Sequence, residues 1–170
     1  KGKQFFSLQS SLVEPIRFLS VDEALLFTGG EYAHSRYRDG ADDGFYQCPD
    51  RITAMHVQRF QDEHHVFLGC KDRRIRMVQR DELIGEISTE RPASALTVRE
   101  MSSRAYELIV GDEGGNVACY LCKTNEESKG SPSLNTKEAW SISGDAKVTC
   151  LSTFDVTRDQ QLDVVVGRAD

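Results

Sequence analysis

Residues 108–111 read Leu-Ile-Val-Gly, and after a short interval the chain continues with Val-Ala-Cys-Tyr-Leu at 117–121. The first run is apolar and ends in glycine. The interval reads Asp-Glu-Gly-Gly-Asn, and these residue types form tight turns between antiparallel strands. The same kind of glycine-closed apolar run occurs at 25–29, 66–70 and 164–167. The chain therefore contains a repeated β-hairpin.

The closing glycines are regularly spaced. Gly29, Gly69, Gly111 and Gly167 lie 40, 42 and 56 residues apart. A period of about 40–50 residues is typical of the four-stranded blades of a β-propeller. Each glycine-closed run follows an earlier alternating run, and those at 66–70 and 108–111 precede two further apolar runs. We therefore predict an all-β fold, a partial β-propeller built from four-stranded antiparallel blades.

The repeat divides the chain into about three blades and two part-blades of one propeller domain over residues 1–170. Residues 4–8 are expected to form the last strand of a preceding blade. Because the last unit stops after its second strand, we expect further blades to complete the ring. The complete blades are expected at 16–48, 52–88 and 95–142, and the next one is expected to begin within 148–170.

A polar segment at 123–138 accounts for the 56-residue step. It contains a single large apolar side chain, Leu134, so burial cannot offset the entropy of ordering it. We expect a loop insertion at 123–138, whose removal restores the period.

The composition narrows the classes of partner. The net charge is −6 and the isoelectric point is near 5.3, whereas nucleic-acid binding needs a basic field. We therefore expect no nucleic-acid partner. No apolar stretch approaches the ~20 residues that a transmembrane helix needs, so we expect no transmembrane segment. Five cysteines, an odd number, and the absence of an Asn-x-Ser/Thr acceptor favour a reducing compartment.

Catalytic motifs are missing from the chain. It has no phosphate-binding loop, nucleophile elbow or pair of zinc-spaced histidines. Cys119 and Cys122 form a Cys-x-x-Cys on an expected strand, where residues three apart point to opposite faces and cannot share one ion. We therefore expect neither enzyme activity nor a cofactor.

One loop has the residues of a calcium site. Asp155, Thr157, Asp159 and Asp163 occupy positions 1, 3, 5 and 9 of the loop that leads into the last apolar run. Oxygen ligands at such spacing can bind Ca²⁺. Threonine at position 3 and Gln160 at position 6 depart from the pattern. The alternative is a metal-free loop whose carboxylates accept backbone N–H groups.

Aromatic residues gather in the first unit. Tyr32, Tyr37, Phe45 and Tyr46 are candidate partner-binding residues, because exposed aromatic side chains often anchor protein contacts. The alternative is that they pack between blades.

Short segments spread along the chain together suggest a family. These are Lys1-Gly-Lys-Gln-Phe5, Glu14-x-Ile16, Leu26-Phe27, the spacing of Tyr32, His34 and Tyr37, Asp50-x-Ile52, Lys71-Asp72-Arg73-x-x-Arg76, and Phe154 to Arg168 with its three spaced aspartates. They resemble the N-terminal propeller of the Bardet–Biedl syndrome protein 7 family. The resemblance runs over nearly the whole chain but is patchy in 123–145. The region around Asp72–Arg76 and Asp81–Ile84 also resembles the related subunit 2 of the same complex.

The resemblance implies a non-enzymatic subunit of the BBSome. That coat-like complex carries membrane proteins into and out of cilia and is recruited by an Arf-like GTPase. The implied partners are sister BBSome subunits and ciliary membrane-protein cargo, in the cytoplasm, the cilium and its basal body. Two other hypotheses remain open: an extracellular, integrin-like propeller that binds calcium and a ligand, and a propeller enzyme with its active site in the central channel.

Overall fold

The computed structural model describes residues 10, 13–60, 62–102, 105–125 and 133–169. In these residues the chain forms strands and no helix. Within each sheet, consecutive strands pair antiparallel in chain order. The prediction of an all-β, propeller-like fold of four-stranded antiparallel units is confirmed.

Three four-stranded sheets and one two-stranded sheet follow one another along the chain. The first sheet contains β1 (Phe18–Asp22), β2 (Leu25–Gly29), β3 (Ala33–Arg38) and β4 (Ala41–Gln47). The second contains β5 (Ile52–Phe60), β6 (Glu63–Cys70), β7 (Arg74–Gln79) and β8 (Glu82–Ser88). The third contains β9 (Ala93–Ser102), β10 (Ala105–Asp112), β11 (Val117–Asn125) and β12 (Ser133–Ile142). The fourth contains β13 (Val148–Phe154) and β14 (Asp163–Arg168).

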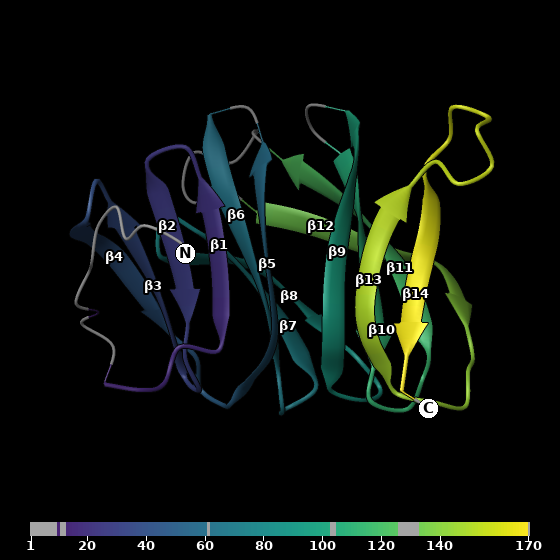
Figure 1. Ribbon diagram of the computed structural model, residues 1–170, viewed down its shortest axis with the longest axis horizontal. Coiled ribbons are helices and arrows are strands. Elements are labelled where there is room, and N and C mark those ends of the chain that lie inside the picture. The colour runs from purple at the N-terminus through teal and green to yellow at the C-terminus, as the bar shows by residue number, and fades with distance from the viewer. Residues whose placement is uncertain (1–9, 11–12, 61, 103–104, 126–132, 170) are drawn as a thin grey trace, which may run out of the picture.

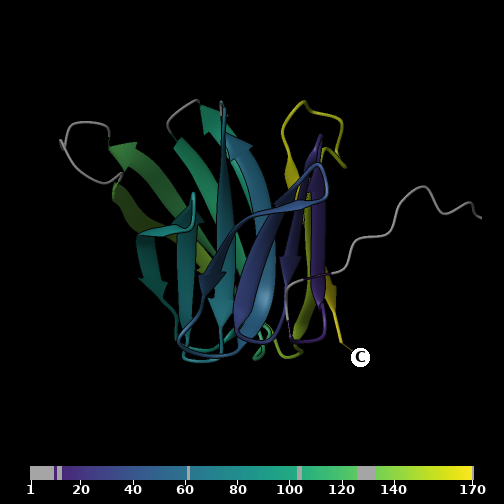
Figure 2. The same cartoon turned by 90° about the vertical axis from the view of Figure 1, so that its left-hand side faces the viewer.

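The sheets stand side by side, from β1–β4 at the left of Figure 1 to β13–β14 at its right. Their first strands β5, β9 and β13 are direct neighbours, as the inner strands of adjacent propeller blades are. The strands run between two rims, and Figure 2 shows the turns gathered at these rims. The turns that join β1 to β2 and β5 to β6 share the upper rim in Figure 1.

The prediction of a loop over 123–138 is wrong at both ends of that segment. Lys123–Asn125 continue β11, and Ser133–Glu138 belong to β12, with Lys123 opposite Asn135. A polar segment can form strands here because pairing satisfies its backbone while the outer edge faces water. Residues 126–132, and the strand predicted at 4–8, lie outside the described residues.

Two of the closing glycines, Gly69 and Gly111, lie where neighbouring sheets pack closely together. A Cβ atom on Gly69 would lie 2.9 Å from the Cβ of Ala93, in β9 of the next sheet. A Cβ on Gly111 would overlap the side chain of Val148, in β13. Real Cβ atoms do not approach so closely, so the repeated glycine is the residue that lets successive sheets pack together.

Three apolar clusters fill the spaces between sheets. The largest joins the second and third sheets and includes Phe67, Met77, Leu108 and Cys122. Cys119 lies in a different cluster with Val148, on the other side of the third sheet. The two cysteines therefore point to opposite faces of that sheet, as predicted from their spacing.

His65 is buried in the core between the second and third sheets. Its ring centroid lies 5.0 Å from that of Phe60 and 6.1 Å from that of Tyr106. Among the described residues its Nδ1 atom is buried without a hydrogen-bond partner. Burial, together with the nearby His64, lowers the pKa of His65 from 6.5 to about 4.

Replacing Gly111 by alanine should lower the free energy of unfolding of the propeller by about 1–3 kcal/mol, because the new methyl group overlaps Val148. Urea denaturation measures the loss. Val148→Ala removes both Cγ atoms from the overlap and leaves its Cβ, 2.6 Å from the new methyl group, so the double variant should be more stable than the sum of the single losses predicts. Strict additivity of the two losses would contradict this packing.

The neutral His65 should make stability pH-dependent. The unfolded chain takes up this proton near pH 6.5, whereas the folded chain resists it down to about pH 4. Stability is therefore unaffected above pH 6.5 and falls as the pH drops from 6.5 towards 4. His65→Phe keeps an aromatic ring without the titration, so the wild type should lose about 3 kcal/mol relative to this variant over that range. Urea denaturation at a series of pH values gives the free energy of unfolding of both proteins. The same pH dependence in the wild type and in His65→Phe would refute this prediction.

Candidate functional site

A charged cleft of about 370 Å³ opens between the first and second sheets on the rim that carries the β1–β2 and β5–β6 turns. Its walls come from the ends of β1, β3 and β5, from the starts of β2, β4 and β6, and from the turns after β1, β5 and β7. The residues that line it are Asp22, Glu23, Ala24, Leu25, Arg36, Arg38, Asp43, Arg59, Asp62, Glu63, His64 and Arg80.

Arg36 closes one side of the cleft. Its Nε donates to the carboxylate of Asp43 at 2.7 Å, and its Nη2 donates to Asp81 Oδ2 at 3.3 Å. Only 16% of the Arg36 side chain is exposed, so this cation is held in place by the two carboxylates. Asp81 follows β7, so the contact joins the first sheet to the second.

The two carboxylates that share Arg36 have opposite pKa shifts. Burial raises the pKa of Asp43, but the hydrogen bonds and charges of Arg36 and Arg38 outweigh it and the net shift is downward. Burial dominates at Asp81 and raises its pKa above the ordinary value, although Arg36 opposes the shift. The carboxyl group of Asp43 therefore stays ionised to a lower pH than that of Asp81 does.

His64 forms the opposite side of the cleft. Its Nε2 lies 2.7 Å from Asp22 Oδ2, and its ring centroid is 5.1 Å from that of Phe27. This pair also joins the first two sheets, because Asp22 is the last residue of β1 and His64 is the second residue of β6. With 14% of its side chain exposed, His64 is fixed between a carboxylate and an apolar ring.

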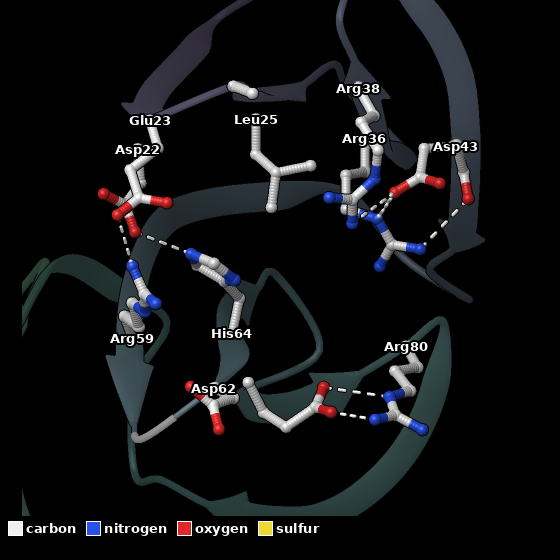
Figure 3. Close-up of a pocket in the computed structure, with 12 residues that line it drawn as sticks. Asp22, Glu23, Leu25, Arg36, Arg38, Asp43, Arg59, Asp62, His64 and Arg80 are labelled. Carbon is white, nitrogen blue, oxygen red and sulfur yellow. Dashed lines mark hydrogen bonds and ion pairs between the residues drawn. The ribbon is translucent and has the colours of Figure 1, made fainter.

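The outer pairs are more exposed than the inner ones. Arg59 Nη1 donates to Glu23 Oε1 at 2.7 Å, and Arg80 Nε donates to Glu63 Oε2 at 2.9 Å. Figure 3 shows these pairs at the edge of the cleft. The side chains of Glu23 and Arg80 are each 74% exposed, so water and other charged groups can reach both pairs.

The cleft has the chemistry of a binding surface. Most of its carboxylates are paired with arginines, and exposed pairs of this kind can exchange partners with a charged group from another molecule. Among the described residues, no group of three or more His, Cys, Asp or Glu side chains is arranged to hold a metal ion.

The four candidate partner-binding aromatics do not share one environment. Tyr37 is 1% exposed, and its hydroxyl lies 2.9 Å from Ser10 Oγ, so the expectation of an exposed anchor is wrong for this residue. Tyr46 packs against the core between the first two sheets. Tyr32 and Phe45 are 41% and 66% exposed, and a partner role for them stays a prediction.

The Asp155–Asp163 loop joins β13 to β14 and is exposed. Asp163 Oδ2 accepts the backbone N–H groups of Val156 and Thr157 at 2.9 and 3.1 Å, and also the Thr157 hydroxyl. These hydrogen bonds from Thr157 and Val156 lower the pKa of Asp163. Asp155 accepts the N–H groups of Asp159 and Gln160. This is the arrangement of the metal-free alternative, and calcium binding at these residues stays a prediction.

The charged cleft was missed by sequence reasoning. The only local signal is the density of acids and arginines in the turns, such as Arg36 to Asp43. The contact from Arg36 to Asp81 spans 45 residues and the one from Asp22 to His64 spans 42, so no local spacing predicts them.

The comparisons with known proteins decide the family. The family model described as the BBS7 beta-propeller matches residues 1–170, which is the whole chain. The chain belongs to the BBS7 β-propeller family. The resemblance found in the sequence is thereby confirmed.

Two curated relatives carry the BBS7 name. The mouse BBSome complex member BBS7 is 27% identical over 179 residues, covering all of this chain and 24% of the relative. The Caenorhabditis elegans BBSome complex member bbs-7 is 25% identical over 180 residues, with the same coverage of 100% and 24%. The chain therefore spans about a quarter of the length of these relatives.

Solved structures agree on the fold of this BBS7 propeller. BBS1N, solved in complex with ARL6DN, matches with a TM-score of 0.66 and 13% identity over 96% of this chain and 50% of that chain. The computationally designed Ika4 protein matches with the same TM-score and identity over 98% of this chain and 99% of that chain. In the described part of the BBS7 propeller, no helix has the length and apolar character needed to cross a membrane.

Arg36→Met should destabilise the BBS7 propeller more than Arg59→Met. The first change leaves Asp43 and Asp81 without their shared, mostly buried cation, whereas the second breaks a pair that water already reaches. The difference in the free energy of unfolding should be at least about 1 kcal/mol. Thermal or urea unfolding of both variants gives the comparison, and equal losses would contradict the assigned burial of Arg36.

Proposed function

We propose that this chain is the propeller part of a non-enzymatic scaffold subunit of the BBSome, which moves membrane proteins to and from cilia. The observation that carries the proposal is the match of the BBS7 propeller family over the entire chain. Both curated relatives are BBSome members and support the same assignment.

The proposed mechanism is scaffolding. Sheets joined by apolar clusters and by inter-sheet ion pairs form a rigid body, which supports partner surfaces at fixed angles. Contacts with sister subunits would come from a few anchoring side chains on the faces and rims. Phe45, which is 66% exposed on β4, is one such candidate.

The proposed partners are sister BBSome subunits, in a hetero-oligomer, together with ciliary membrane-protein cargo. The proposed location is the cytoplasm, the cilium and the basal body. Nucleic acid is not a proposed partner, since the chain carries a net charge of −6.

Affinity purification of the tagged full-length protein from ciliated cells tests this function. We expect recovery of a stoichiometric multi-subunit complex that contains other BBSome members. Phe45→Ser should reduce the recovery of at least one subunit, whereas Phe154→Ser, a change at an equally exposed phenylalanine on β13, serves as the matched control. Recovery of a lone monomer would overturn the proposal.

A further inference from the structure

The two rims of the first two sheets carry different charge. The four turns on the rim of the charged cleft, at 22–24, 38–43, 59–63 and 80–82, contain nine acidic and three basic residues. The connections on the opposite rim, at 30–32, 48–51, 71–73 and 89–92, contain four of each. The net negative charge of these two sheets' turns is therefore confined to the rim where the cleft opens.

The cleft offers carboxylates that a second molecule can reach. Figure 3 shows the exposed Asp62 in the lower part of the view, between Arg59 and Arg80. The charge of Arg59 is near it, but Asp62 makes no hydrogen bond or ion pair with the residues that the structure describes. Within the described part of the chain, the ion-pair partners of Glu23 and Glu63 are Arg59 and Arg80, whose side chains are 40% and 74% exposed.

The inner pairs give the cleft a fixed shape. Arg36 is held by two carboxylates, and His64 is held between Asp22 and Phe27. Pairs that join both sheets therefore set the depth of the cleft, while the outer pairs can rearrange at little cost because exposed ion pairs contribute only ~0–1 kcal/mol.

We propose that the charged cleft binds a lysine- or arginine-rich segment of a partner protein. This inference rests on the proposed scaffold function, since it specifies the chemistry of one partner contact. A basic side chain enters beside Asp62 and takes over the carboxylates of Glu23 and Glu63, while Arg59 and Arg80 turn outward into water. The excess of negative charge on this rim attracts the segment and speeds its association.

The same charge argues against other occupants of this rim. Anionic lipid surfaces and nucleic acids would face nine acidic residues in the surrounding turns, and bringing like charges together is unfavourable. We therefore assign a protein segment, and not a lipid surface or a nucleic acid, as the occupant of the cleft. Its affinity should fall as salt screens the charges.

A fluorescent peptide of alternating arginine and glycine tests the inference by anisotropy titration against the purified full-length protein. A peptide of alternating glutamate and glycine is the matched probe of opposite charge. The double variant Glu23→Gln/Asp62→Asn removes two negative charges at the cleft. Glu90→Gln/Asp145→Asn removes two from exposed positions on the opposite rim and is the control.

We expect the arginine peptide to bind, the glutamate peptide not to bind, and Glu23→Gln/Asp62→Asn to weaken binding about tenfold, while the control variant changes it less than about twofold. Equal weakening by both variants, or no binding of the arginine peptide, overturns the inference. If the peptide fails to bind while the multi-subunit complex is still recovered by affinity purification, the inference falls and the scaffold function stands. A lone monomer in that purification counts against the scaffold function itself.

Discussion

Neighbouring blades pack closely at the glycines near the ends of β6 and β10, and the apolar packing between the sheets depends on that approach. At Gly69 and Gly111 a methyl group would meet Ala93 or Val148 of the next blade. The approach brings the first strands together and allows side chains such as Phe67 and Leu108 to meet in a shared core. Because each blade buries its faces only against its neighbours, a side chain at one of these glycines weakens the packing between two blades.

The inter-blade contacts at the rims are electrostatic. On one rim, Arg36 with Asp81 and His64 with Asp22 connect the first two sheets. On the other rim, Lys71 pairs with Glu113 of the third sheet. The Arg36 and His64 side chains are mostly buried and add to stability, whereas the exposed Lys71–Glu113 pair contributes little to it. A rigid apolar interior with rearrangeable charges at the rim suits a protein that works through contacts with other proteins.

The candidate site shows which features a sequence can reveal. The period of the glycines predicts blades, and the resemblance to the BBS7 family is carried by short segments spread over the chain. The exposure of the aromatic residues in the first unit is harder to predict from sequence. Tyr37 and Phe45 look equivalent there, yet Tyr37 is buried and Phe45 is exposed. Their difference depends on which face of the sheet is covered and by what.

The sequence by itself determined the strand repeat, the four-stranded unit and the family. These depend on local patterns, namely apolar runs, turn residues and a glycine at a fixed place in each unit. Only the tertiary structure decided that Lys123–Asn125 and Ser133–Glu138 extend a hairpin, because their strand pairing is a contact between segments whose polar composition suits a loop equally well. It also decided the charged cleft, since Asp22 meets His64 and Arg36 meets Asp81 only after two blades have packed together.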